Sequence, residues 1–240
     1  MNLSLIKQNR VALIMLLFAV LQTIASCNQS SSSLSSRTPE QNREWYKSLS
    51  PEWHKAMKEH IYLLDAPTDN DLAKMMALPK VDVHGITTIK DLEPLRPLTG
   101  LKWLDCGQTE VGSLEPIKEA KGMLKLNCDY THIADLSPLA EFKKLQMFWC
   151  MSSSVTDLSP LSNLPALLTL NASRTLIKSI EPLRNCPKLA ALTIADTPIE
   201  SIAPLMDLDD IKFLDIRQTK VGAKEVNEFK KKHPNCDVKY

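Results

Sequence analysis

Apolar positions in this chain recur every 22 residues from Leu92 to the C-terminal region. The main leucine column is Leu104, Leu126, Phe148, Leu170, Leu192 and Leu214, and a second column in the same register holds Pro94, Pro116, Pro138, Pro160, Pro182 and Pro204. A fixed period of this length is typical of stacked repeats, in which no single unit can bury its apolar face alone. The pattern therefore predicts a solenoid.

Within each unit, apolar residues two positions apart predict a short strand with one buried face, as at Leu104 and Cys106. The segment that returns to the next strand begins with a residue whose side chain can accept a hydrogen bond from the free N–H groups of a helix start. This column is Asp91, Ser113, Asp135, Asp157, Ser179 and Ser201. Proline follows three residues later, where a missing N–H costs little. Each unit is thus predicted to be a strand, a loop and a short capped turn of helix, and the strands are predicted to form a parallel ladder.

The spacing Leu101-x-x-Leu104-x-Cys106-x-x-Thr109-x-Val111 resembles the leucine-rich repeat, in the 22-residue form shared by internalins and phosphatase-regulating repeat proteins. The resemblance implies an α/β solenoid with a concave parallel sheet and short 3₁₀ or helical turns on the convex side. Where the family often has asparagine, this chain has Thr109, Thr131, Ser153, Thr175, Thr197 and Thr219. We expect this ladder of hydroxyl groups to bond the backbone of neighbouring loops.

Caps are predicted at both ends of the repeats, which span residues 81–221. In residues 39–80, apolar side chains recur every four residues and predict helices that shield a first strand near Val81 and Val83, with Pro51 as a break and a further helix containing Leu72, Met75 and Met76. The alternative is a separate binding arm. In residues 222–240, a helix with Val226 and Phe229 precedes a final strand, which the 22-residue step places with Cys236 in the main leucine column.

The N-terminal residues are predicted to be an export signal and not to form part of the folded domain. Lys7 and Arg10 precede an apolar run over 11–21, which is too short for a standard membrane span of about 20 residues. Ile24-Ala25-Ser26-Cys27 then resembles the bacterial lipoprotein signal. The resemblance implies a signal peptide over 1–26, acylation of Cys27, a serine-rich tether over 27–38 and an anchor in the cell envelope, with the outer membrane favoured because Asn28 is not aspartate. An uncleaved anchor or an ordinary secretory signal are the alternatives.

The search for chemistry gives no catalytic set, and no enzyme, metal or cofactor is expected. Cys106, Cys128 and Cys150 share an inward column that continues with Ala172 and Ile194, which favours buried thiols over a disulfide or a metal site. No histidine or serine motif of known catalytic type is present. The net charge is +1, and removal of Lys7 and Arg10 changes it to −1, so nucleic acid is not an expected partner. We expect a monomer.

The candidate binding surface follows from strand alternation, because residues that flank the inward positions must point outward. On that concave face Trp149 lies between Met147 and Met151, and exposed apolar clusters often mark interaction sites. The predicted partner-binding residues are Trp103, Lys125, Asn127, Asp129, Tyr130, Met147, Trp149, Met151 and Phe213. Binding of a protein or peptide is the first hypothesis; recognition of a glycan or envelope polymer and a purely structural spacer are the alternatives. If the N-terminal cap or a neighbouring loop covers the cluster, its side chains are part of the fold and do not form a binding site.

Overall fold

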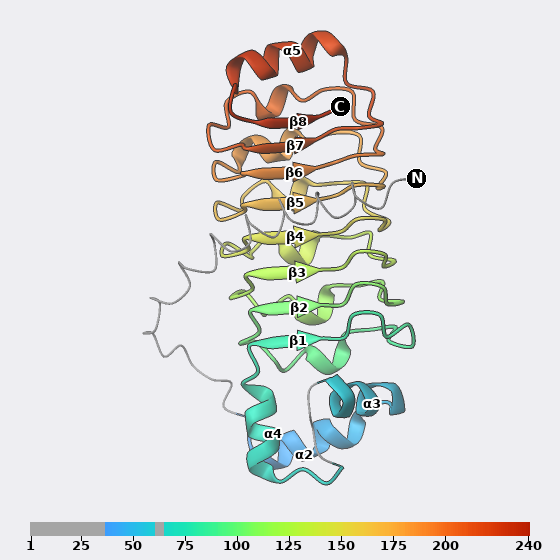
Figure 1. Cartoon of the computed structure of the whole chain (residues 1–240). Helices are drawn as coiled ribbons and strands as arrows, with labels where there is room; N and C mark the ends of the chain where they lie inside the picture. Colours follow the sequence, from blue (N-terminus) through green and yellow to red (C-terminus); the bar gives the residue numbers. More distant parts are fainter. Residues whose placement is uncertain (1–36, 61–64) are drawn as a thin grey trace. The chain divides into compact units, whose positions relative to one another are not determined.

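The computed structural model describes residues 37–60 and 65–240, so the predicted signal peptide and Cys27 lie outside the described residues. Short parallel strands alternate with 3₁₀ helices, and α-helices lie at both ends of the strand series (Figure 1). The strands are β1 (Lys80–Asp82), β2 (Trp103–Asp105), β3 (Lys125–Asn127), β4 (Met147–Trp149), β5 (Thr169–Asn171), β6 (Ala191–Thr193), β7 (Phe213–Asp215) and β8 (Asp237–Lys239). The 3₁₀ helices are η2 (Glu93–Leu95), η3 (Glu115–Ile117), η4 (Ser137–Leu139), η5 (Ser159–Leu161), η6 (Glu181–Asn185) and η7 (Ala203–Leu205), and the α-helices are α2 (Pro39–Ser48), α3 (Pro51–His60), α4 (Asp69–Met76) and α5 (Ala223–Lys232).

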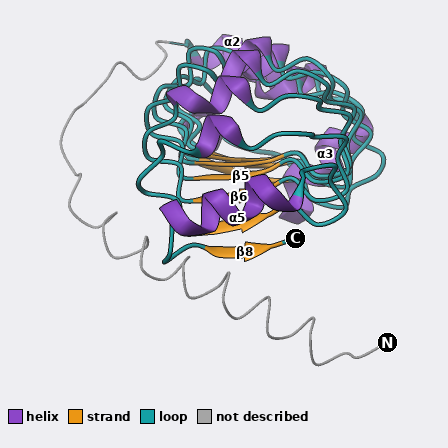
Figure 2. Ribbon diagram, turned by 90° about the horizontal axis from the view of Figure 1, so that it is seen from above, coloured by secondary structure: helices purple, strands orange, loops and turns teal. Residues whose placement is uncertain are grey.

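The strands pair in chain order from β1 to β8 and are all parallel. Viewed along the stack, the strands lie on one side and the 3₁₀ helices on the opposite side (Figure 2). The main leucine column lies inside, and each of its six residues from Leu104 to Leu214 has no exposed surface. The predicted α/β ladder of strand, loop and short turn is therefore confirmed, with the turns in 3₁₀ form.

The predicted capping column accepts hydrogen bonds from N–H groups at the start of each 3₁₀ helix. Asp91 Oδ1 accepts from Glu93 N at 2.9 Å, and Ser113 Oγ accepts from Glu115 N at 3.2 Å. The same bond, from a side chain to the N–H two residues later, occurs at Asp135, Asp157, Ser179 and Ser201. Each acceptor lies one residue before the N-cap, which makes no side-chain capping bond, as at Leu92 and Leu114. The prediction that this column supplies the N-caps is therefore wrong, because its side chains bond the N–H two residues later and form a turn just before the helix.

The loops after β2 to β7 each close through a hydroxyl bond within their own repeat. Thr109 Oγ1 donates to Cys106 O at 2.6 Å, and Thr175 Oγ1 donates to Ala172 O at 2.7 Å. The predicted bonds to neighbouring loops are therefore wrong, because the carbonyl three residues earlier already lies within reach. The residue before each hydroxyl has a left-handed backbone, with φ between 54° and 58° at Gln108, Tyr130, Ser152, Arg174, Asp196 and Gln218.

The register departs from the 22-residue step at both ends of the ladder. Val81 pairs with Leu104, which is a step of 23, and Leu214 pairs with Val238, which is a step of 24. The prediction that Cys236 continues the main leucine column is therefore wrong, and Val238 takes that place. The physical reason is that α5 replaces the 3₁₀ turn in the last unit and lengthens the return path.

The N-terminal helices pack against the first repeat. Two tryptophans are buried in the same core as Leu92 and donate to backbone carbonyls beside η2: Trp45 Nε1 to Pro94 O at 2.9 Å, and Trp53 Nε1 to Asp91 O at 3.2 Å. The break at Pro51 and the further helix over Leu72–Met76 are as predicted. Helices α2–α4 lie beyond β1, at the end of the ladder (Figure 1), so they act as a cap and do not form a separate arm.

Replacement of Thr175 by valine tests the hydroxyl ladder. Thr175 is 2% exposed, so the substitution keeps the shape of the side chain but leaves Ala172 O without its hydroxyl donor. We expect the free energy of unfolding to fall by about 1–2 kcal/mol in urea titrations. Thr175→Ser retains the donor and is the control. Equal stability of the valine and serine variants would contradict a role for the bond.

Candidate functional site

The outward face of the sheet is made by the strand residues whose side chains alternate with the buried column. At each pairing step the side chains of neighbouring strands lie directly beside one another, roughly 4.8 Å apart. Asp105 pairs with Asn127, Asn127 with Trp149, and Trp149 with Asn171. One row across this face is thus an acid, an amide, an indole and a second amide. Because this row lies on the outward face of β2–β5, it is the candidate ligand site.

The apolar cluster around Trp149 is smaller than the sequence pattern predicts. Trp149 and Met151 are half-buried, and Tyr130 is 44% exposed. Met147 is only 4% exposed, although alternation places it on the outward face. It pairs with Lys125 on one side and Thr169 on the other. The surface open to a partner is therefore Trp149, Met151 and Tyr130.

Two predicted site residues lie apart from this cluster. Trp103, two strands from Trp149, has the Nζ of Lys80 3.3 Å from its ring centroid, so the chain's own cation covers part of the indole. Phe213 lies on β7, three strands from Met147 and roughly 14 Å along the sheet. Lys125 lies between Trp103 and Met147 in the register. The structure therefore groups Asn127, Asp129, Tyr130, Trp149 and Met151, and separates Phe213 from them.

A polar cluster adjoins the apolar one at the carboxyl ends of β1–β3. The ring Nδ1 of His84 lies 3.0 Å from Asp105 Oδ1, which also accepts from Gly107 N at 3.0 Å. Gly107 makes this approach possible, because a Cβ there would lie 2.9 Å from His84 Nδ1 and 3.2 Å from Asn127 Nδ2. The absent side chain thus lets groups from three repeats meet.

Asp129 is the carboxylate of this cluster whose charged form is disfavoured by burial. Its Oδ1 accepts from Met151 N at 2.6 Å. Burial raises the pKa of Asp129 to about 6, and the negative charge of Asp105 adds to the rise, while the Met151 N–H bond and His84 oppose it. A group whose charged form is disfavoured, on a face open to partners, is a candidate functional group.

The inward cysteine column carries no reactive group. Cys106, Cys128 and Cys150 are free and buried, so the predicted thiols are confirmed over a disulfide. Burial raises the pKa of each of these thiols, and the thiolate is the reactive form. Cys106 Sγ instead donates to Asn127 O at 3.3 Å, and Cys128 Sγ to Trp149 O at 3.2 Å. These side chains pack beneath the candidate site as small apolar groups.

Over residues 37–60 and 65–240, no group of three or more His, Cys, Asp or Glu side chains is placed to hold a metal ion. Among the helices in the same ranges, none has the length and apolar character needed to cross a membrane.

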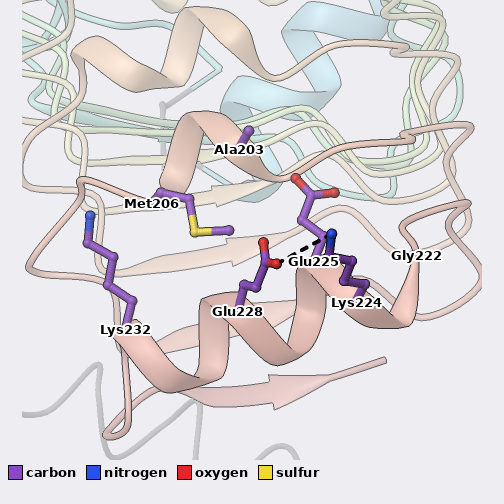
Figure 3. A pocket seen from close by; sticks show the side chains of 7 residues that line it. All are labelled: Ala203, Met206, Gly222, Lys224, Glu225, Glu228 and Lys232. Carbon is purple, nitrogen blue, oxygen red and sulfur yellow. Dashed lines mark ion pairs between the residues drawn. The ribbon is translucent and has the colours of Figure 1, made fainter.

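A shallow groove at the other end of the stack is a packing seam. It lies between η7 and α5 (Figure 3) and is lined by Ala203, Met206, Gly222, Lys224, Glu225, Glu228 and Lys232. Glu225 Oε1 accepts from Ser201 Oγ at 2.7 Å and from Ile202 N at 3.0 Å, and Lys232 Nζ lies 2.6 Å from Asp207. These bonds hold α5 on the last repeat, so the polar groups of Glu225 and Lys232 at the groove are engaged in attaching the C-terminal cap.

The sequence pattern missed His84 and Asp105 as members of the site. A strict step of 22 from Gly107 leads to Gly85, whereas the step of 23 in the first repeat places His84 in that position. Only the strand register reveals this. Strand alternation places Asp105 on the outward face, two residues after Trp103. Its pairing position next to Asn127 is the feature that could have identified it as a member of the site.

Replacement of Asp129 by asparagine tests the cost of the carboxylate. The pKa of Asp129 is raised on folding, so ionisation destabilises the folded state, and this loss appears as the pH rises from about 4 through 6. Asparagine can still accept from Met151 N. We expect Asp129→Asn to be more stable than the parent by about 2 kcal/mol at pH 7.5 and equal to it near pH 4, measured by urea unfolding. An unchanged stability at pH 7.5 would mean that burial imposes no penalty there.

Comparison with known proteins gives a fold but no close relative. No protein-family model matches the chain, and no curated protein matches it. Among the solved structures that match are an internalin (InlF) from Listeria monocytogenes, with 23% identity and a TM-score of 0.51, and internalin C2 from the same species, with 21% identity and a TM-score of 0.60. The aligned regions cover 62% of this chain and 50% of the first internalin, and 78% of this chain and 92% of the second.

A leucine-rich-repeat protein of Leptospira interrogans matches with 16% identity and a TM-score of 0.54, covering 72% of this chain and 57% of that protein. The chain therefore spans about half the length of the first internalin and more than half of the Leptospira protein. Identities this low carry fold information alone. Together with the ladder of parallel strands and 3₁₀ turns, these matches show that the chain has the leucine-rich-repeat fold.

Proposed function

We propose that this chain is a lipid-anchored protein of a bacterial cell envelope that binds a protein or peptide partner through the outward sheet face around Trp149. The observation that carries the binding role is a half-buried Trp149 between Asn127 and Asn171, with exposed Tyr130 nearby. Tryptophan and tyrosine are the side chains that most often anchor protein interfaces. The adjoining carboxylate of Asp129 adds specificity, because it is costly to bury and gains from a partner of opposite charge.

The anchor rests on the sequence before Cys27, with its positive start, apolar run and small residues. Attachment of several acyl chains would hold the chain at a membrane, since a single chain binds only marginally. The outer membrane is the proposed site.

A glycan is the second candidate ligand, and the row Asn127–Trp149–Asn171 favours it. The Oδ1 atoms of the two amides accept from Asp129 N and Ser173 N, which leaves both NH₂ groups available beside the indole. A flat indole flanked by amide donors can stack on a sugar ring and bond its hydroxyl groups. A glycan array on the same protein separates this candidate from the first, because only sugar recognition predicts specific spots on it.

Truncation of the aromatic cluster tests the binding role. We expect the double variant Trp149→Ala and Met151→Ala to capture at least tenfold less partner in crosslinking pull-downs from the native envelope. Both side chains are half-buried on the outward face, so thermal unfolding should change little. Leu176→Ala, which truncates a 65% exposed leucine outside the strands, is the matched control. Undiminished capture by the double variant would exclude this face as the binding surface.

Replacement of Cys27 by alanine tests the anchor separately. The variant lacks the thiol that would carry the lipid, so we expect it to move from the membrane fraction to the soluble fraction after cell breakage. Mass spectrometry of the parent chain should show the added mass of acyl groups on Cys27. A parent chain without acyl groups would remove the proposed anchor and leave the binding role unaffected.

A further inference from the structure

Two carboxylates on the outward face, Asp105 and Asp129, have no lysine or arginine partner among the described residues. Within the described residues Asp129 forms no ion pair, and the imidazole of His84 is the one side chain of the basic residues that contacts Asp105. Asp105 Oδ1 accepts from His84 and Gly107 N, and Asp129 Oδ1 accepts from Met151 N. The second oxygen of each carboxylate has no hydrogen-bond partner among the described residues. Both carboxylates therefore keep free acceptor capacity toward the outward face.

Another carboxylate on the same face, Asp215, has both of its oxygens bonded by an arginine of the chain. Asp215 lies on β7 and Arg217 in the loop that follows. Arg217 donates from Nε to Asp215 Oδ1 at 2.9 Å and from a terminal nitrogen to Oδ2 at 2.5 Å. Asp215 lies in the repeat position of Asp105, and Arg217 lies in that of Asp129. Within one repeat these two positions lie close enough for the guanidinium of one residue to reach the carboxylate of the other. In the repeats of β2 and β3 no arginine fills either position: Asp105 is followed two residues later by Gly107, and Asp129, one repeat on, is preceded two residues earlier by Asn127. The two carboxylates are near enough for the charge of Asp105 to act on Asp129.

The charges along the strands separate toward opposite ends. Lys80 and Lys125 lie at the amino ends of β1 and β3, and Lys80 is engaged by Asp82 at 3.6 Å and by the ring of Trp103. Asp105 and Asp129 lie at the carboxyl ends, or just past them, together with His84. The carboxyl ends of β2 and β3 therefore present net negative charge to a partner, beside the indole of Trp149.

The apolar neighbours of the acids suit a long basic side chain. Trp149 pairs with Asn127 beside Asp105, and Met151 lies one repeat from Asp129 and donates its N–H to that residue. Arginine and lysine carry aliphatic stems that pack on apolar surface, and a guanidinium stacks on aromatic rings. A further group on this face lacks a partner: the Ser173 hydroxyl, in the repeat position next to Met151, is buried and makes no hydrogen bond.

From this geometry we propose that the outward face at β2–β4 binds a basic side chain of a peptide or protein partner, with arginine preferred. The charged group lies between the carboxylates of Asp105 and Asp129, and the aliphatic stem lies against Trp149 and Met151. The inference rests on the proposed function and states the chemistry of the partner at that site. Arginine is preferred because its fork of N–H donors can bond two carboxylate oxygens at once, as Arg217 does with the two oxygens of Asp215.

Selection from a random 12-residue peptide display library on the immobilised full-length chain tests this directly. We expect the recovered peptides to share an arginine or lysine beside an apolar residue. Recovery should fall at least tenfold on the double variant Asp105→Asn and Asp129→Asn, because the charge-assisted bonds are lost while the asparagines keep the local backbone bonds. Asp209→Asn, an exposed loop residue far along the chain, removes one negative charge elsewhere and should leave recovery unchanged.

The same peptides give a pH signature. Asp129 has a pKa raised to about 6 by burial, and it is faced by Asp105 from β2, by His84 from the loop after β1 and by the Met151 N–H from the loop after β4. Peptide binding should therefore weaken several-fold between pH 7.5 and pH 5, as Asp129 gains a proton and loses its charge. Replacement of the peptide arginine by citrulline, which has the same shape without the charge, should reduce binding at pH 7.5 to its level at pH 5.

The outcomes separate this inference from the proposed function. Recovered peptides that lack basic residues but depend on Trp149 would overturn the arginine site and leave the binding surface standing. Recovery that is equal on the double variant Trp149→Ala and Met151→Ala, or no enriched peptide at all, would overturn both.

Discussion

Pairing of each strand with the next one along the chain is the constraint on which the rest of this structure depends. A single repeat has a three-residue strand and a small set of inward apolar side chains, and alone it can neither pair its strand backbone groups nor bury those side chains. Stacking solves both problems in one step, and it also fixes the surface. Each outward side chain has as neighbours the residues one repeat before and after it, so the composition of the outward surface is set by which residues share a pairing position. Asp105, Asn127 and Trp149 adjoin one another for this reason alone.

The turns that allow this stacking carry a conformational cost. Every repeat from Gln108 to Gln218 has a left-handed residue that is not glycine, at a cost of about 1–2 kcal/mol each. The N–H of that residue donates to the next repeat, as from Gln108 N to Asp129 O at 2.8 Å, and the following hydroxyl bonds back to its own strand end. The chain thus offsets local strain with bonds inside and between repeats. At Tyr130 this geometry also places a ring at the edge of the candidate site, 44% exposed.

Periodicity predicted the strands, the buried columns, the side chains that accept bonds at the start of each 3₁₀ helix and the helices at both ends, because each depends on residue type at a regular spacing. It failed where the spacing changes. A step of 23 in the first repeat brings His84 beside Gly107, and a step of 24 in the last one moves Val238 into the place expected for Cys236. It also failed where exposure depends on neighbours across strands: Met147 is buried between Lys125 and Thr169, and Trp103 lies under Lys80. Alternation gives the direction of a side chain, and only the neighbouring strands decide how much of it a partner can touch.

The contrast between Asp129 and Asp215 links stability to binding in this fold. Both are partly or fully buried carboxylates of the outward face, but Asp215 has a bidentate arginine from its own chain, whereas Asp129 has one backbone N–H and a neighbouring negative charge. If folding were the only requirement, an amide at position 129 would keep the bond to Met151 N without the cost of burying a charge. A ladder with no ligand gains nothing from that carboxylate. In the proposed arginine site, a bound cation would offset this cost, and the gain would give the face both affinity and selectivity for charge.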